Sequence, residues 1–239
     1  MDRILIVKNI TREGPGLLAA VLAEQNISYD VVDLSKGGTF PSPLAYRALI
    51  VLGGPASAND RTALMADELA GVRQALDHHI PYLGICLGLQ AGVMAAGGSV
   101  VAGDTKETGL RDPEGNPYTV QLTAAGKNDP LLAGLADEVR VFQLHGETVV
   151  PTADMMVLGT GKWCTNQIVR IGERAYGIQS HFELTPEMLA VWAAEDPDLA
   201  PLGAAALLTE FHTIREEYTR TGRTLLHNFL QLASLYQPL

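Results

Sequence analysis

The sequence predicts an α/β protein with a mostly parallel central sheet flanked by helices, a small side β region and a helical C-terminal extension. Three observations lead to this prediction. Short apolar runs alternate with amphipathic helical stretches over the first hundred residues. Residues 104–180 break into short runs separated by Gly, Pro, Asp and Asn, and the chain becomes helical after Pro186. Strands that alternate with helices need crossover connections, which produce a parallel sheet with helices on both faces.

The expected elements follow one another in the first hundred residues. Runs typical of buried strands are residues 4–7, 28–34, 46–54 and 81–85. The intervening stretches repeat apolar residues at helical spacing, as shown by Leu17, Leu18, Val21 and Leu22 and by Met65, Leu69, Val72 and Leu76. A third helix is expected at 87–98, where two glycines close it.

The rest of the chain is predicted to form short strands first and helices after them. Antiparallel strands lying beside the sheet are expected at 118–122, 139–145, 155–159, 166–172 and 174–181. The helical end carries an apolar stripe that we assign to core packing: Leu225, Leu226, Phe229, Leu230, Leu232 and Leu235.

Composition excludes several classes of protein. The 239 residues are 47% hydrophobic and 18% charged, which supports a substantial core. A net charge of −10 argues against binding to nucleic acid or to an anionic membrane surface. The first apolar run has four residues, too few for a signal peptide or a spanning helix, and two cysteines make no disulfide framework. We therefore expect a cytoplasmic protein.

One cysteine stands in an unusual setting. Residues 84–90 read GICLGLQ, so Cys86 lies where a strand ends and a helix begins, with Gly84 and Gly88 beside it. Such flanking glycines permit a sharp turn that presents a side chain at its tip, as in the nucleophile elbow of hydrolases. A helix N-terminus also favours the thiolate. A buried thiol at a strand–helix junction is the alternative, and this stretch alone does not decide between them.

A nucleophilic cysteine needs a base, and His181 is the best candidate among six histidines. It follows a strand-like run, and Glu183 stands two residues later. Residues i and i+2 of an extended segment point to the same side, so the carboxylate can hold one imidazole nitrogen while the other faces Cys86. A surface His–Glu pair at a strand end is the alternative.

Paired glycines follow another strand. The run 46–54 ends in Gly53-Gly54-Pro55, where backbone N–H groups can approach a substrate closely. Beside a nucleophile elbow, the N–H groups of Gly54 and Leu87 are a candidate oxyanion hole, and a plain strand-to-loop turn is the alternative.

These motifs occur in a family-specific order over about residues 40–185: strand–GGP, G-x-C-x-G-x-Q, His-Gly-acid and a late His-x-Glu. Together they resemble class I (triad) glutamine amidotransferases, and among them proteins similar to the glutaminase domain of GMP synthase. The resemblance implies a Cys86–His181–Glu183 triad and an oxyanion hole at Gly54 and Leu87. It also implies substrate contacts from Gln90 and the loop of His145, Gly146 and Glu147, with the acid meeting the substrate α-amino group.

The sequence departs from the family pattern at two positions. Phe182 replaces the usual Pro of His-Pro-Glu, which extended geometry tolerates, and Glu147 stands where Asp is commoner. The segment Cys164–Gln167 resembles a subfamily feature whose role the sequence leaves open. On the resemblance we divide the chain into a catalytic domain, residues 1–185, and a helical extension packed on it, residues 186–239.

The expected function is hydrolysis of the γ-amide of L-glutamine through a cysteinyl thioester, with release of ammonia. A γ-glutamyl peptidase, or a non-catalytic regulatory protein on the same fold, remains an alternative. No phosphate-loop, dinucleotide, HExxH or CxxC motif is present, so no metal or organic cofactor is expected. Ammonia would pass to a synthetase partner or be released by a free-standing hydrolase, and the C-terminal helices favour the second.

Overall fold

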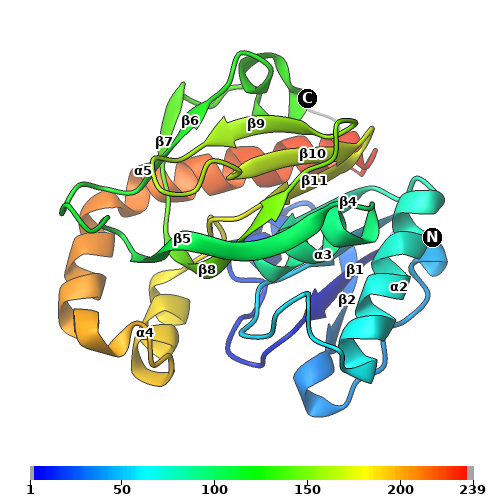
Figure 1. Ribbon diagram of the computed structural model, residues 1–239, viewed down its shortest axis with the longest axis horizontal. Helices are drawn as coiled ribbons and strands as arrows, with labels where there is room; N and C mark the ends of the chain where they lie inside the picture. Colours follow the sequence, from blue (N-terminus) through cyan, green and yellow to red (C-terminus); the bar gives the residue numbers. More distant parts are fainter. Residues whose placement is uncertain (1–2, 236–239) are drawn as a thin grey trace.

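One large sheet organises the molecule. The computed structural model describes residues 3–235, and in this range the sheet has nine strands in the order β2-β1-β3-β4-β11-β10-β9-β6-β7 (Figure 1). The five strands from β2 to β11 are parallel, and the four beyond them are antiparallel. Their bounds are β1 Arg3–Lys8, β2 Ser28–Asp33, β3 Ala48–Val51, β4 Tyr82–Ile85, β6 Thr119–Leu122, β7 Glu138–Arg140, β9 Met156–Thr160, β10 Ile168–Gly172 and β11 Ala175–Ile178. The predicted fold class is confirmed.

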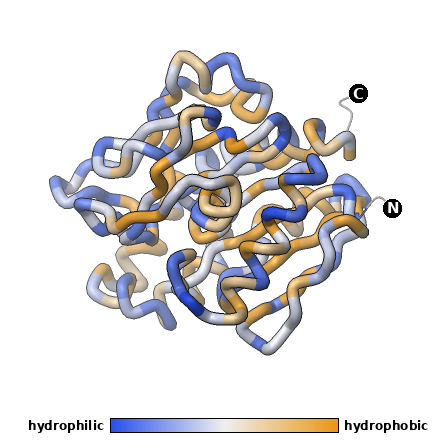
Figure 2. The backbone as a smooth tube through the Cα atoms, turned by 45° about the vertical axis from the view of Figure 1, so that its right-hand side comes forward, coloured by the Kyte–Doolittle hydropathy of each residue, from blue (hydrophilic) through white to orange (hydrophobic). Residues whose placement is uncertain are grey.

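Helices cover both faces of the sheet, and the strands alternate between two cores. Ile4 and Ile6 of β1 pack with α1 and α5, whereas Leu5 and Val7 pack with α2 and α3. This alternation is the two-residue period of a strand buried on both faces. Figure 2 shows hydrophobic colouring along the central strands and mixed colouring along the helices that cover them. The helices that cover the sheet are α1 Leu17–Glu24, α2 Ala63–Asp77, α3 Leu87–Ala95 and α5 Ala204–Leu232.

The strands expected beside the sheet mostly extend it, which corrects their predicted placement. Segment 174–181 supplies β11, which lies at the centre of the sheet, parallel to β4 and antiparallel to β10. All four β11 residues are buried, as expected for a strand with neighbours on both sides. The separate side sheet consists of β5 (Ser99–Gly109) and β8 (Gln143–Val150) alone.

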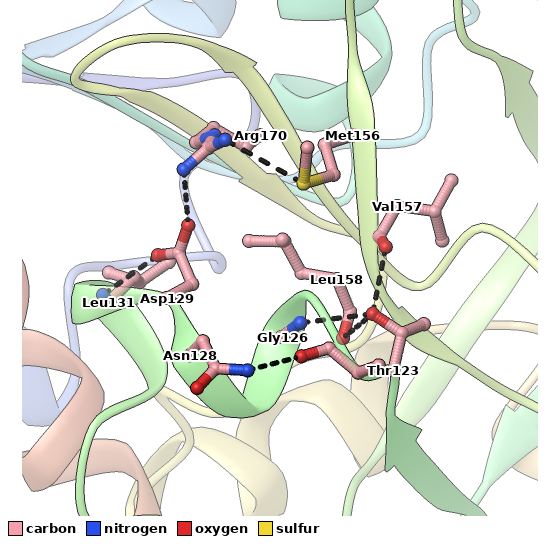
Figure 3. Close-up of polar contacts among 10 residues, drawn as sticks. Thr123, Gly126, Asn128, Asp129, Leu131, Met156, Val157, Leu158 and Arg170 are labelled. Atoms are coloured by element: carbon pink, nitrogen blue, oxygen red, sulfur yellow. Dashed lines mark hydrogen bonds and ion pairs between the residues drawn. The ribbon is translucent and has the colours of Figure 1, made fainter.

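The segment between β6 and β7 is hydrogen-bonded to β9 and β10 (Figure 3). The Thr123 hydroxyl donates to the carbonyls of Val157 at 3.0 Å and Leu158 at 3.2 Å. Arg170 of β10 donates to the buried Asp129 carboxylate at 2.9 Å. These contacts fix two short 3-10 turns of this segment, Gly126–Asn128 and Pro130–Leu132, against the sheet. Elsewhere in the described residues, 3-10 turns are Leu34–Lys36, Pro43–Ala45 and Ala200–Leu202.

From Pro186 onward the chain is mostly helical, as predicted. Residues 236–239 lie outside the described residues. Helix α4 spans Pro186–Glu195, and the long α5 runs along the sheet (Figure 1). The apolar stripe of α5 packs on the sheet: Leu225, Leu226, Phe229 and Leu230 are buried, and Leu232 and Leu235 are partly buried against the same core. Within residues 3–235 no helix has the length and apolar character needed to cross a membrane.

Candidate active site

Cys86 occupies the turn between β4 and α3 in a backbone conformation that L-residues rarely adopt. Its φ is 53° and its ψ is −107°, and its N–H donates to the carbonyl of Ile178 at 2.8 Å. The predicted sharp turn at this position is therefore confirmed. A non-glycine residue held at positive φ is strained, and such strain concentrates at functional sites.

The glycines around Cys86 are required by close backbone approach. A Cβ atom on Gly88 would stand 2.1 Å from the carbonyl oxygen of Val51, and one on Gly84 would stand 2.3 Å from the backbone of Gly88. Neither neighbour is a flexible side chain that could move away. The sequence G-x-C-x-G is thus the one that lets α3 start directly against β3 and β4.

His181 and Glu183 follow β11, two residues apart on the same side of the chain. Glu183 Oε1 lies 2.7 Å from His181 Nδ1, and both side chains are buried. Burial by itself lowers the pKa of His181. The Glu183 charge and the hydrogen bonds with Cys86 and Glu183 outweigh burial and raise this pKa well above its ordinary range. The imidazole Nδ1 is thereby held by a carboxylate, and Cys86 is near enough to influence its titration.

Aromatic side chains and one hydroxyl fix the histidine in place. The ring of Trp192, from α4, packs edge to face against the His181 ring with 4.9 Å between the ring centroids. The Phe142 ring packs in the same way with 6.4 Å between its centroid and that of His181. The hydroxyl of Tyr218 on α5 donates to the His181 carbonyl at 2.9 Å. The helices beyond residue 185 therefore line one side of the histidine.

A cleft of about 340 Å³ brings most of the predicted site residues together. The predicted residues that line it are Gly54, Cys86, Gln90, His145, Gly146, Glu147 and His181. Glu183 lies behind His181, and the buried Leu87 begins α3 directly after the cysteine. Residues from four separate parts of the chain thus converge at the carboxyl ends of the parallel strands, where ligands of such sheets bind.

The glycine pair after β3 is packed tightly against this cleft. A Cβ atom on Gly54 would stand 2.5 Å from Asn9 Cβ, and Asn9 is itself anchored to the Leu52 carbonyl at 3.2 Å and to Glu68 at 3.1 Å. A Cβ atom on Gly53 would stand 3.4 Å from Cys86 Cβ. Only glycine brings the backbone this close to the cysteine, as a pair of oxyanion-binding amides would require.

The opposite part of the cleft is polar. Ser57 donates to the Glu147 carboxylate at 2.9 Å, and Gln90 donates to the Glu147 carbonyl at 3.4 Å. His145 Nδ1 lies 3.0 Å from that same carbonyl, which only accepts, so Nδ1 carries a proton. His145, Gly146 and Glu147, expected in a loop, lie in strand β8, and these contacts fix the strand around the Glu147 carboxylate.

A cluster of buried side chains behind strand β8 includes Cys164 and Gln167 of the segment Cys164–Gln167, and so gives part of that segment a structural role. His145 Nε2 lies 2.9 Å from Glu107 Oε2, and Gln167 donates to the same oxygen at 3.1 Å. Cys164 lies 3.1 Å from the Thr148 hydroxyl, and burial raises its pKa. Within residues 3–235, Glu107, His145 and Cys164 form the group whose ligand atoms could converge on a metal ion, all within 4.8 Å. The group packs behind strand β8, and its contacts with Gln167 and Thr148 help to hold that strand in place.

Sequence reasoning missed an acid in this cleft. Glu13, in the loop after β1, lines the cleft although it is only 5% exposed. Arg12 beside it pairs with Asp196 at 2.6 Å. Burial raises the pKa of Glu13 to about 7, with smaller contributions from His181 and Arg12, which lower it, and from Glu183 and Asp196, which raise it. The sequence feature that could have predicted this acid is its place next to a glycine, shortly after the carboxyl end of the first parallel strand.

Comparison with known proteins agrees with this geometry. The family model described as glutamine amidotransferase class-I matches residues 16–190. A GMP synthase [glutamine-hydrolyzing] of Porphyromonas gingivalis is 32% identical over 75% of this chain, which spans 33% of that relative's length. One subunit of a GMP synthase [glutamine-hydrolyzing] of Natronomonas pharaonis is 27% identical, over 82% of this chain and 94% of its own.

The same likeness is seen in three dimensions. The crystal structure of a glutamine amidotransferase from Thermotoga maritima superposes with a TM-score of 0.84 at 26% identity, covering 97% of each chain. The match extends over nearly the whole molecule, the sheet and its covering helices included. The chain belongs to the class I glutamine amidotransferase family.

Proposed function

We propose that this chain hydrolyses the γ-amide of L-glutamine through a thioester on Cys86 and releases ammonia. The observation that carries the proposal is one cleft that holds a cysteine at positive φ together with a histidine buried against a carboxylate. A thiol with an oriented imidazole beside it is the arrangement for nucleophilic attack on a carbonyl carbon.

In the proposed mechanism each of these residues has a role. The Cys86 thiolate attacks the γ-carbonyl carbon, and His181, held by Glu183, protonates the departing nitrogen. The backbone N–H groups of Gly54 and Leu87 stabilise the oxyanion. His181 then activates the water that hydrolyses the thioester, which returns the cysteine and yields glutamate.

The polar part of the cleft supports binding of an amino acid. The Glu147 carboxylate faces the cleft with Ser57, where it can meet the substrate α-amino group. Gln90, His145 and Gly146 complete this wall. The carboxylate at position 147 is one methylene longer than aspartate, and its hydrogen bond from Ser57 fixes where that extra length places it.

The ammonia released in this cleft can either pass to a partner protein or leave into solution. A relative named as one subunit of a GMP synthase supports a synthetase partner that consumes the ammonia. A free-standing hydrolase would instead turn over at full rate alone. Adding a candidate synthetase to the purified chain separates the two, because a partnered glutaminase should accelerate and a free-standing one should not.

The test of the function measures ammonia and free amine from the purified chain. L-Glutamine and glutathione are supplied separately, so that amidase and γ-glutamyl peptidase activity are distinguished. We expect glutamine turnover that the Cys86→Ala variant abolishes and the Cys164→Ser variant retains. Wild-type protein that releases neither product, and forms no glutamyl adduct on Cys86, would show that the chain is not an amidase.

A further inference from the structure

The cleft contains a carboxyl group that the proposed mechanism does not use. Glu13 approaches Gly53 so closely that a Cβ atom there would stand 2.4 Å from Glu13 Oε2, 3.0 Å from His181 Cε1 and 3.4 Å from Cys86 Cβ. The acid, the imidazole and the thiol therefore meet over one glycine. Within the described chain, Glu13 Oε2 is buried and has no hydrogen-bond partner.

The two basic side chains at this end of the cleft each bind a carboxylate other than Glu13. Arg12 binds Asp196 at 2.6 Å, and Lys106 binds Asp198 at 2.5 Å. A buried polar group without a hydrogen bond is costly, so its persistence here indicates a partner supplied from outside the chain. That partner enters through the cleft, since Glu13 is one of its lining residues.

The position of Glu13 indicates which donor it meets. Cε1 is the ring carbon between Nδ1, which Glu183 holds, and Nε2, which remains available, so Glu13 lies beside the ring edge that includes Nε2. A group that receives a proton from Nε2 lies next to this edge, within reach of a carboxylate placed there. In amide hydrolysis the group that does so is the leaving nitrogen, which still carries N–H bonds.

We propose that Glu13 is a further catalytic residue, whose carboxylate accepts a hydrogen bond from the leaving nitrogen of the substrate and holds it beside His181. The proposal rests on the proposed amidase function and adds a leaving-group site to it. It names the class of substrate favoured there: γ-glutamyl amides whose leaving nitrogen bears a hydrogen after attack.

The step involves one bond formed and one broken. Cys86 sulfur forms the C–S bond, the tetrahedral intermediate collapses, the C–N bond breaks, and the proton on His181 Nε2 moves to nitrogen. Ammonia or an amine leaves, and Glu13 exchanges no proton. As nitrogen takes up the proton it gains positive charge, which a fixed carboxylate stabilises more in the transition state than in the ground state.

The charge state of Glu13 gives the site a pH dependence. His181, Glu183, Arg12 and Asp196 face Glu13, and burial is the largest influence on its pKa of about 7. The carboxylate form, which accepts the N–H most strongly, therefore increases as pH rises through neutrality. The rate of amide cleavage should therefore increase as pH rises through neutrality.

The test compares a substrate with an N–H leaving group and one without. L-Glutamine is the first, and the γ-methyl ester of glutamate, whose leaving group is methanol, is the second. Glu13→Gln should lower kcat/KM for glutamine by about tenfold to a hundredfold and change that for the ester by less than about threefold. Asp129→Asn, which removes a buried carboxylate paired with Arg170 far along the sheet (Figure 3), should change neither.

The wild-type protein provides a second measurement that does not depend on a variant. The ratio of kcat/KM for glutamine to kcat/KM for the ester should rise with pH through about 7, because both substrates are attacked by the same cysteine and only the amide has an N–H for Glu13 to accept. In Glu13→Gln this ratio should be flat.

Three outcomes would overturn the proposal. Equal losses on amide and ester would make Glu13 a structural residue while the amidase function stands. A wild-type ratio that does not change with pH would do the same. Wild-type protein that cleaves neither substrate and forms no glutamyl adduct on Cys86 would remove the amidase function and the leaving-group site together.

Discussion

The two oxygens of the Glu183 carboxylate are bound by two successive residues, His181 and Phe182. Oε1 lies 2.7 Å from His181 Nδ1, and Oε2 accepts the backbone N–H of Phe182 at 2.9 Å. A proline at position 182, the usual residue of the family pattern, has no N–H to donate. The departure at this position therefore adds a hydrogen bond to the carboxylate that orients the imidazole.

The first prediction is that the charge of Glu183 is needed for turnover. Glu183→Gln keeps the size of the side chain but removes the charge that raises the His181 pKa, and its amide can hold the wrong tautomer. We expect kcat on glutamine to fall about a thousandfold or more, with a smaller change in KM. The control is Glu187→Gln on the exposed start of α4, and a loss below tenfold would contradict the assignment.

The motifs of this site were predictable because each depends on local geometry. Cys86 needs a turn that Gly84 and Gly88 permit, and His181 and Glu183 need an extended segment, so both can be inferred from neighbouring residues. Their convergence follows from the rule that sites form at the carboxyl ends of parallel strands.

The features that sequence reasoning missed depend on contacts between distant segments. β11 occupies the centre of the sheet because it pairs with β4, which lies about ninety residues earlier in the chain. Trp192 and Tyr218 confine His181 only because α4 and α5 fold back on the sheet. The burial of Glu13 likewise comes from packing over Gly53, and an acid in a glycine-rich loop is usually exposed.

The second prediction concerns the two cysteines, both of which are about 5% exposed. Brief treatment with iodoacetamide should label Cys86 before Cys164, because Cys86 lines the cleft at a helix N-terminus, whereas burial raises the pKa of Cys164. Peptide mapping at short times measures both rates. Glutamine should protect Cys86, and His181→Ala should slow its labelling. Equal rates for the two cysteines would contradict the role of Cys86 as nucleophile.

The third prediction is that Gly54→Ala impairs turnover more than folding. The new Cβ would stand 2.5 Å from Asn9 Cβ, and Asn9 is anchored by Leu52 and Glu68, so the loop itself must shift. A displaced Gly54 N–H should lower kcat by about a hundredfold, the effect of losing one oxyanion donor.

The control for this change is Gly172→Ala on β10. Its Cβ would meet Ala175 Cβ at 3.5 Å, which is ordinary contact, so activity should be retained. Thermal unfolding of both variants shows whether a loss of turnover reflects the loop or the fold. Activity of Gly54→Ala within a few-fold of wild type would make Gly54 a turn residue only.

The last prediction is that Glu13 costs stability at alkaline pH. Its pKa rises from 4.5 to about 7 on folding, chiefly through burial. Between these values the folded chain keeps a proton that the unfolded chain has released, so the free energy of unfolding falls as pH rises from about 4.5 to 7 and stays lower above it. Glu13→Gln should remove this fall: equal stability near pH 4.5, and a gain of about 1–3 kcal/mol at pH 8. Urea unfolding of both proteins across this range measures the difference. Glu68, whose pKa is also raised to about 7 by burial, contributes equally to both and cancels. A pH-independent difference would contradict the raised pKa of Glu13 in the folded chain, whereas a gain that appears only as pH rises would support it.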